Sequence, residues 1–404
     1  MLSDLKSLRI EDYDYPLPDD RIARYPLARR DHSRLLALQG ESLGEHRFLD
    51  LPSLLPQDTM LVFNDTRVIH ARLFFRKETG ATIEVFCLEP HAMAISEAFE
   101  QRGHCTWTCL IGNNKKWKEG PLTLHFTSRQ AEYTLAATRR QAVGNAWIVD
   151  FQWDGGSSFA EVIEAAGVIP LPPYMNRQAE ASDADRYQTV YALHDGSVAA
   201  PTAGLHFTPE VLERLKASGV DTEYITLHVG AGTFKPVSTP TIGGHEMHVE
   251  PVHVTASNLR RLAAHSGRPL VAVGTTTVRT LESLYWFGVQ LQQDPDLPGM
   301  HIRQWDPYTL PSQGLPYADA YGNILRWMER HGTDRLAGAT QLMIAPGYEY
   351  KVIRGLVTNF HQPKSTLLLL VSALVGDRWR EVYRYALAHG FRFLSYGDSC
   401  LFLP

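Results

Sequence analysis

The hydrophobic pattern of the chain changes twice, and this change restricts the folds that the chain can adopt. From Val68 to Asp154, short segments of alternating or β-rich composition follow one another, separated by polar turns such as Gly112–Gly120. Closely spaced strands without helices between them are typical of a small barrel or sandwich. Residues 68–154 are therefore predicted to form an all-β barrel, with strands at 82–88, 105–111, 122–126, 132–136 and 146–153.

Helices alternate with strands on both sides of this block, which predicts an α/β main domain. Ser158 and Glu161 fit a capping box, and Gly167 follows the predicted end of that helix. Further helices are expected at 209–218, 255–267, 278–287, 320–331, 365–375 and 377–389, and strands at 35–38, 60–63, 222–229, 269–273, 341–345, 355–360, 391–394 and 400–403. We expect residues 1–67 and 155–404 to form one mixed sheet with flanking helices, into which the barrel of residues 68–154 is inserted.

Residues 288–340 interrupt this rhythm. They carry Pro, Gly, Asp and several aromatic residues, with a helix expected near Ala320–His331. Long excursions of this kind are often lids, interfaces or disordered segments. We treat 288–340 as an extra insertion in the main domain, and a lid, an interface and a disordered segment all remain open.

Overall composition excludes several classes of protein. The 404 residues carry a formal net charge of −5, so no global basic field points to a nucleic acid, although local basic patches remain possible. Four cysteines in this length favour a reducing compartment. The N-terminus has no apolar signal segment, and Leu367–Val375 is too short to span a bilayer. We expect a cytoplasmic protein that does not contact a membrane.

Two loops rich in small residues each present one histidine. Ala199–Phe207 contains His206, and Leu227–Phe234 contains His228. Small residues let a ligand approach the backbone closely, and imidazole titrates nearest to neutral pH. The pattern favours a ligand pocket over the alternative, in which two tight connections hold satisfied histidines.

Other histidines also follow predicted strands. His361 lies in Val357–Pro363, and His245 and His248 lie between two predicted elements. Loops that follow strands of one sheet meet at its carboxyl edge, where ligands of open α/β sheets bind. The spacing of His245 and His248 differs by one residue from that of zinc-protease helices, so we favour a polar contact loop over a metal site and predict no metal.

A third loop, Gly274–Thr277, connects the apolar strand Leu270–Val273 to a helix. A run of apolar residues without alternation is typical of a parallel strand that is buried on both faces. The free N–H groups at the start of the following helix could hold an anion, although ordinary capping explains the same residues equally well.

The common nucleotide-binding and nucleophile motifs do not occur. Gly230 and Gly232 follow a strand, but the next residues, Thr233–Val237, cannot open a helix, which argues against a dinucleotide fold. No Ser or Cys lies on a sharp turn suited to nucleophilic catalysis. Lys115, Lys116 and Lys118 surround Trp117, a pattern that fits either phosphate and base contacts or a solvated turn.

A series of long motifs, in order along nearly the whole chain, resembles one known family. The motifs are Leu17–Pro26, Arg30–Leu36, Val62–Leu73, Gly167–Tyr174, Tyr187–Tyr191, the two histidine loops, Ala272–Ser283, Pro346–Lys351, Leu356–His361 and Ser395–Asp398. The chain resembles the S-adenosylmethionine:tRNA ribosyltransferase-isomerases of queuosine biosynthesis.

This resemblance implies a monomeric two-domain enzyme without a metal or an organic prosthetic group. Such enzymes use S-adenosylmethionine as a co-substrate and transfer and isomerise its ribosyl moiety onto 7-aminomethyl-7-deazaguanine (preQ1) in the tRNA anticodon. Adenine and methionine leave, and epoxyqueuosine remains in the tRNA. Two alternatives stay open: a paralogue that acts on another nucleoside acceptor, and a non-catalytic RNA-binding protein.

The resemblance also suggests roles for particular residues. His206 and His228 are the first candidates for general acid–base catalysis, followed by His361 and Asp398. The residues expected to contact S-adenosylmethionine are Thr202, Gly204, Gly230, Gly232, Thr233, Thr275, Arg279, Asn359 and Tyr396. The residues expected to face tRNA phosphates are Arg67, Arg72, Lys115 and Lys116.

Overall fold

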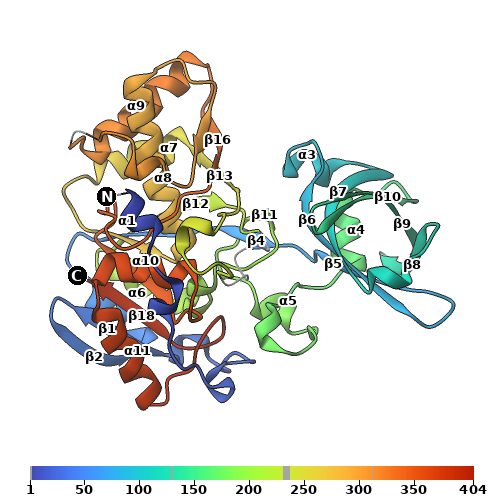
Figure 1. Cartoon of the computed structure of the whole chain (residues 1–404), viewed down its shortest axis with the longest axis horizontal. Helices are drawn as coiled ribbons and strands as arrows, with labels where there is room; N and C mark the ends of the chain where they lie inside the picture. Colours follow the sequence, from blue (N-terminus) through green and yellow to red (C-terminus); the bar gives the residue numbers. More distant parts are fainter. Residues whose placement is uncertain (1, 129–130, 231–236, 313) are drawn as a thin grey trace.

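Most of the strands expected outside residues 68–154 lie in one large mixed sheet (Figure 1). The computed structural model describes residues 2–128, 131–230, 237–312 and 314–404. The sheet has ten strands in the order β15-β16-β13-β12-β3-β14-β17-β18-β1-β2. In that order they are Met300–Ile302, Arg335–Thr340, Glu250–Thr255, Asp221–Leu227, Met60–Asn64, Leu270–Val273, Gly355–Asn359, Ser399–Leu403, Arg34–Gln39 and Ser42–Arg47.

The centre of this sheet is parallel and buried on both faces. Strands β12, β3, β14 and β17 run parallel to their neighbours in this group, and β18 runs antiparallel to β17. In β3, Met60 and Val62 belong to one core cluster, while Leu61 and Phe63 belong to another on the opposite face. This alternation follows from the period of two in a strand. Strand β14 is buried along its whole length and pairs in parallel with β3 and β17, which confirms the prediction that Leu270–Val273 is a buried parallel strand.

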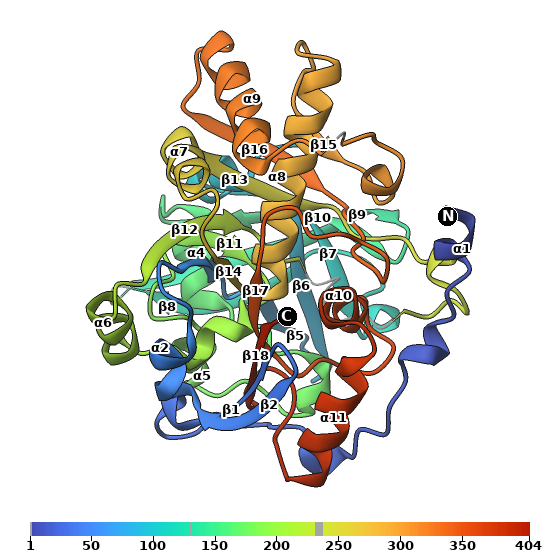
Figure 2. The ribbon, with the colours of Figure 1, turned by 90° about the vertical axis from the view of Figure 1, so that its left-hand side faces the viewer.

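Helices cover both faces of the sheet. The described helices are α1 (Leu2–Lys6), α2 (Leu51–Leu54), α3 (Ile95–Glu100), α4 (Phe159–Ala166), α5 (Asp183–Arg186), α6 (Pro209–Ala217), α7 (Ala256–Ala264), α8 (Thr275–Gln293), α9 (Tyr317–Arg330), α10 (Thr366–Val375) and α11 (Arg378–Ala388). Apolar residues of α8, α10 and α11 share one core cluster, and those of α2 and α6 share the cluster on the other face. The long helix α8 crosses the centre of the view in Figure 2.

A second sheet forms the predicted barrel. Its strands, in the order β5-β6-β7-β10-β9-β8, are Arg72–Arg76, Thr82–Pro90, His104–Gly112, Ala146–Trp153, Ala131–Val143 and Leu122–Ser128, all antiparallel to their neighbours. The first and last strands of the sheet, β5 and β8, lie close together, so the barrel is nearly closed. It has its own core, to which α4 contributes Phe159, and it lies to one side of the large sheet in Figure 1.

The capping box predicted at the start of α4 is present. The Ser158 hydroxyl accepts a hydrogen bond from the Glu161 backbone N–H, and the Glu161 carboxylate accepts one from Ser158 N at 2.9 Å. A two-stranded parallel sheet, β4 (Thr66–Val68) and β11 (His194–Ser197), lies where the chain leaves the large sheet for the barrel.

Much of the segment 288–340 is packed against the large sheet and its helices. Strands β15 and β16 add to one end of the sheet, and α9 packs against α7 and α8. Tyr321 donates a hydrogen bond from its hydroxyl to Leu281 O at 3.0 Å, and Trp327 donates from its indole to Leu297 O at 2.8 Å. These contacts make the described part of the segment an extension of the main core.

The observed elements differ from the predicted ones at several places. In the large sheet β2, β13, β15 and β16 were not expected, and in the barrel β5 was not expected. The strands expected at 341–345 and 391–394 are absent: both runs are buried, but the first follows the end of β16, and the second makes only an isolated bridge from Phe393 to Ile22. The apolar run Leu367–Val375 lies in the buried helix α10, as predicted, and no helix of the described residues has the length and hydropathy to cross a bilayer.

Candidate active site

The loops singled out in the sequence meet at one edge of the large sheet. His228 follows β12, Gly274 follows β14 and His361 follows β17, and these three strands point in the same direction. Because β18 is antiparallel to β17, Asp398 at its start lies at the same edge. The convergence predicted for the histidine loops is confirmed for the loops that contain His228 and His361. His206 follows β11, which belongs to the small sheet, so the expectation that its loop follows a strand of the large sheet is wrong.

A cavity with an empty volume of about 760 Å³, partly open to solvent, lies at this edge. Its walls come from Ala199–Ala203, Gly274–Thr276 and Thr358–Gln362, together with Tyr174, Val229, Ser365, Leu367, Leu394 and Ser395. None of these described residues carries a formal charge apart from the titratable His361. The cavity therefore offers backbone groups, hydroxyls and the side-chain amides of Asn359 and Gln362 to a ligand in a largely apolar setting.

His361 lines this cavity directly. Its Nε2 lies 2.9 Å from Thr358 Oγ1, and its backbone N–H donates to Tyr383 Oη at 3.0 Å. Burial lowers the pKa of His361 to about 3, because a desolvated imidazolium is disfavoured. The ring is therefore neutral near pH 7.

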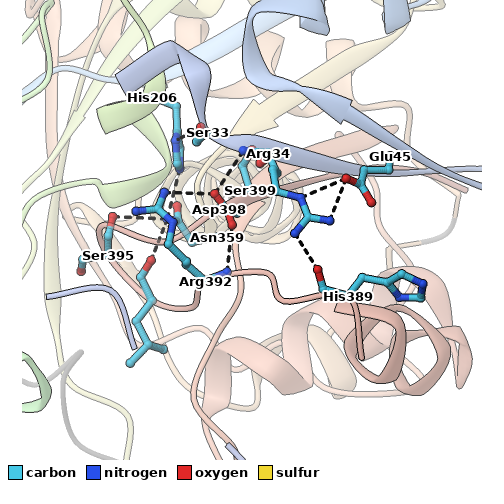
Figure 3. Close-up of polar contacts among 11 residues, drawn as sticks. Ser33, Arg34, Glu45, His206, Asn359, His389, Arg392, Ser395, Asp398 and Ser399 are labelled. Carbon is cyan, nitrogen blue, oxygen red and sulfur yellow. Dashed lines mark hydrogen bonds and ion pairs between the residues drawn. The ribbon is translucent and has the colours of Figure 1, made fainter. Parts of the chain in front are cut away.

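His206 contacts Asn359 (Figure 3), and it is not among the residues that line the main cavity. Ser33 Oγ is 2.7 Å from His206 Nδ1, and Asn359 Nδ2 is 3.2 Å from His206 Nε2. Because the amide nitrogen can only donate, Nε2 accepts and Nδ1 carries the proton that is donated to Ser33. Burial lowers the pKa of His206 to about 4, partly opposed by the carboxylate of Asp398.

Asn359 is oriented by these contacts. Its Nδ2 also donates to Leu394 O at 2.9 Å and to Ser395 O at 3.3 Å. Its Oδ1 is buried and has no hydrogen-bond partner among the described residues. Since Asn359 lines the cavity, its Oδ1 is an acceptor left for something that the protein itself does not supply.

His228 contacts the small sheet. Its Nδ1 lies 3.0 Å from Thr66 Oγ1, which also contacts Ser197 Oγ at 2.8 Å. A Cβ atom added to Gly196 would lie 2.5 Å from the ring, so glycine at that position makes room for the imidazole. Burial lowers the pKa of His228 to about 3. Its neighbour Val229 lines the cavity, while the ring of His228 packs against β4 and β11.

Asp398 is a buried anchor between chain segments (Figure 3). It accepts hydrogen bonds from the backbone N–H groups of Arg34 at 3.1 Å and Arg392 at 2.8 Å, and it forms an ion pair with the Arg392 guanidinium at 3.1 Å. The carboxylate thus ties the start of β18 to β1 and to the preceding loop, and it lies close enough to His206 to affect its titration.

A comparison with protein families decides which family the chain belongs to. A family model described as "Queuosine biosynthesis protein" matches residues 10–402. The chain belongs to this family.

Curated relatives of this queuosine biosynthesis family support the assignment. A protein of Dechloromonas aromatica named S-adenosylmethionine:tRNA ribosyltransferase-isomerase is 40% identical, over 98% of this chain and 97% of that protein. A protein of the same name from Pelobacter propionicus is 39% identical, over 96% and 98%. A solved structure of S-adenosylmethionine tRNA ribosyltransferase from Thermotoga maritima is 28% identical, over 97% and 100%, with a TM-score of 0.46.

The other residues predicted to contact S-adenosylmethionine have different surroundings in the structure. Thr202, Thr275 and Asn359 line the cavity. Gly204 packs elsewhere, because an added Cβ would lie 2.0 Å from Tyr191 Oη. Gly230 is half-buried directly after Val229, and the predicted contacts of Gly232 and Thr233 lie outside the described residues.

Arg279 and Tyr396 belong to other clusters. Arg279, in α8, forms a buried ion pair with Glu250 at 2.5 Å. Tyr396 donates a hydrogen bond to Asp183 Oδ1 at 3.0 Å and lines a second, smaller cavity beside His206. Arg30, Arg186 and Arg392 also line that second cavity, which shares Ser395 with the main one.

The basic residues proposed to face RNA lie along the barrel and its connection. Arg67 forms an exposed ion pair with Asp195 at 3.8 Å, and Arg72 pairs with Glu84 at 3.1 Å. Lys115 and Lys116 are exposed. Trp117 is only 2% exposed, which excludes the base contacts considered for it. The lysines of this turn can then contact RNA only through their charge.

Sequence reasoning did not name several residues that form the site. Ser33 and Ser395 position His206 and Asn359, and Thr276 lines the cavity. All three lie in motifs that carry the family resemblance, and Thr276 also follows the glycine between a buried strand and a helix. Ser33 and Ser395 come from loops whose proximity depends on the order of strands in the sheet.

Proposed function

We propose that this protein transfers and isomerises the ribosyl moiety of S-adenosylmethionine onto 7-aminomethyl-7-deazaguanine in tRNA. Adenine and methionine are released, and epoxyqueuosine remains in the RNA. The family assignment and the names of relatives about 40% identical over nearly the whole chain support this function. S-adenosylmethionine is a co-substrate in this proposal, and the residues themselves supply the acid–base chemistry.

The observation that carries the proposal is the cavity at the sheet edge, with its uncharged, largely apolar lining. The sulfonium makes the neighbouring ribose carbon acidic, and loss of its proton converts a cation into a neutral ylide. The proton passes to a neutral base, so the step moves one positive charge from the sulfonium to that base, and a described lining without acidic or basic residues places no other fixed charge beside either group.

Among the three candidate histidines, His361 is the best placed to accept that proton, because its side chain lines the cavity. If Nε2–H donates to Thr358 Oγ1, the lone pair of Nδ1 is available as a base. The pKa of His361, lowered to about 3 by burial, keeps the ring neutral at pH 7 and also makes it a weaker base than an exposed imidazole, so its contribution here rests on its position in the cavity.

His206 acts as a positioning residue in this scheme. Both of its ring nitrogens are engaged, by Ser33 and by Asn359. The chain of contacts from Ser33 through His206 to Asn359 orients the amide so that Oδ1 is left for the ligand. Asp398 contributes by holding Arg392 and β1 near this chain.

We further propose that residues 68–154 form an inserted domain that helps to bind the tRNA. Arg67 and Arg72 lie at the connection to the barrel, and Lys115 and Lys116 lie on an exposed turn between β7 and β8. Arginine and lysine side chains contact phosphates without regard to base sequence. The guanidinium groups of Arg30, Arg186 and Arg392 add positive charge beside His206.

The experiment that tests the function is an adenine-release assay with labelled S-adenosylmethionine. We expect adenine and methionine to form in equal amounts when tRNA carrying preQ1 is present, with epoxyqueuosine in the recovered tRNA. Turnover with a free nucleoside acceptor but not with the tRNA would favour a paralogue. RNA binding without consumption of S-adenosylmethionine would contradict an enzymatic role.

A further inference from the structure

The helix that starts at the cavity has an uncapped N-terminus. Helix α8 begins at Thr275, and its N-cap is Gly274, whose φ of 87° suits glycine and which has no side chain to accept a hydrogen bond. The first N–H groups of a helix have no partner within it, and the helix dipole makes this end positive. The first turn contains no acidic residue. This end of a 19-residue helix therefore presents donors to the cavity.

Thr276 provides a second, independent indication of a ligand. It lines the cavity, it is only 7% exposed, and its Oγ1 has no hydrogen-bond partner among the described residues. A buried hydroxyl without a partner is costly unless something else bonds to it. The neighbouring Thr277 differs, because its Oγ1 donates to Val273 O at 2.7 Å. Hydroxyls in helices commonly bond to the carbonyl four residues earlier in this way.

The end of the adjacent strand, β17, provides a hydrogen-bond acceptor rather than a donor. Asn359 is 3% exposed, and its Oδ1 also lacks a partner among the described residues. It ends β17, which pairs with β14 through Val273 and Val357, and Gly274 N donates to Val357 O at 2.8 Å. The cavity thus has donors for an anion at one strand end and an acceptor for a cationic N–H group at the next.

We infer that this pair of groups binds the α-amino-acid end of S-adenosylmethionine, which rests on the proposed function. The carboxylate accepts hydrogen bonds from the start of α8 and from Thr276 Oγ1, and the ammonium donates to Asn359 Oδ1. A carboxylate and an ammonium on one carbon match donors and an acceptor on neighbouring strand ends. An RNA phosphate could also occupy a helix N-terminus, but it has no donor for Asn359.

The test compares S-adenosylmethionine with its decarboxylated analogue, in titrations without RNA. The wild-type protein is expected to bind S-adenosylmethionine about 10- to 100-fold more tightly, the range for a hydrogen bond to a charged group. Thr276→Val has the same shape and is expected to reduce that preference severalfold. Its melting temperature should stay the same or rise, because an unpaired buried hydroxyl is removed.

Thr277→Val is the matched control. It removes a hydroxyl with an internal partner, so we expect a lower melting temperature and an unchanged preference between the two ligands. The inference is overturned if Thr276→Val retains the full preference, or if it weakens RNA binding while leaving the affinity for S-adenosylmethionine intact. If the wild-type protein binds neither ligand, the titrations are repeated with tRNA carrying preQ1, and failure to bind S-adenosylmethionine there as well contradicts the proposed function.

Discussion

The three buried histidines have different surroundings, and this difference predicts different effects of substitution. His361→Ala removes the proposed base from the cavity and is expected to lower kcat for adenine release by about 10²- to 10⁴-fold. His228→Gln replaces a ring that contacts Thr66, so kcat should stay within about threefold while the melting temperature falls. Steady-state assays and thermal melts check both. Equal loss of kcat in the two variants would contradict the assignment.

The sequence singled out all three histidines, and the proposal made from their surroundings ranks them differently from the sequence prediction. His206 and His228 ranked first because they lie in loops rich in small residues. A count of small neighbours does not show which way a ring points. His206 points toward Ser33, which precedes β1, and toward Asn359 at the end of β17, whereas His228 points toward Thr66 of β4.

At the level of elements, a buried carboxylate fixes α8 in the core. Glu282 in α8 is fully buried and accepts hydrogen bonds from Tyr348 Oη at 2.8 Å and from the backbone N–H groups of Lys351, Val352 and Ile353 at 3.0, 3.0 and 3.2 Å. Burial raises the pKa of Glu282, and these donors act against that shift. The carboxylate therefore links α8 to the segment that leads into β17.

Glu282→Ala leaves these donors buried without a partner. We expect a loss of about 3–5 kcal/mol in the free energy of unfolding, measured in urea. Glu349→Ala is the control, because its side chain is 86% exposed in its pair with Lys351, and we expect a loss below about 1 kcal/mol. A loss that small in Glu282→Ala would contradict the linking role.

Element types could be predicted from periodicity better than strand pairing could. Five of the six described barrel strands and most described α-helices followed from alternation and capping, as at Ser158 and Thr208, while β5 was missed. The runs Gln341–Ala345 and Phe391–Leu394 are buried as their composition indicated, yet they form no strand, because burial does not require a pairing partner. Strand β13 was missed because its sequence includes Pro251 and His253 among its apolar residues.

For the whole molecule, the buried histidines predict a loss of stability in acid. The pKa of His206 is lowered to about 4, and those of His228 and His361 to about 3, from 6.5 in each case. Below about pH 6.5 the unfolded chain binds protons that the folded protein does not. Each histidine then lowers the free energy of unfolding by up to about 1.4 kcal/mol per pH unit.

Urea unfolding at pH 7.5, 6.0 and 5.0 measures this effect. We expect the free energy of unfolding to fall steeply below pH 6.5 and to fall less steeply in His228→Gln. The exposed His91 provides a control, since His91→Gln should leave the slope unchanged. A slope as steep in His228→Gln as in the wild-type protein would show that this ring does not titrate as described.

The most direct test of the whole account fills the cavity at the sheet edge and measures turnover. Thr202 is half-buried in its wall, so Thr202→Phe should occupy the space without rebuilding the core. Leu310→Phe, in a separate groove beside α1, serves as the matched control. We predict that the wild-type protein and the control release adenine from S-adenosylmethionine with tRNA carrying preQ1, while a folded Thr202→Phe variant releases almost none. Wild-type turnover by the filled variant would show that the reaction takes place elsewhere.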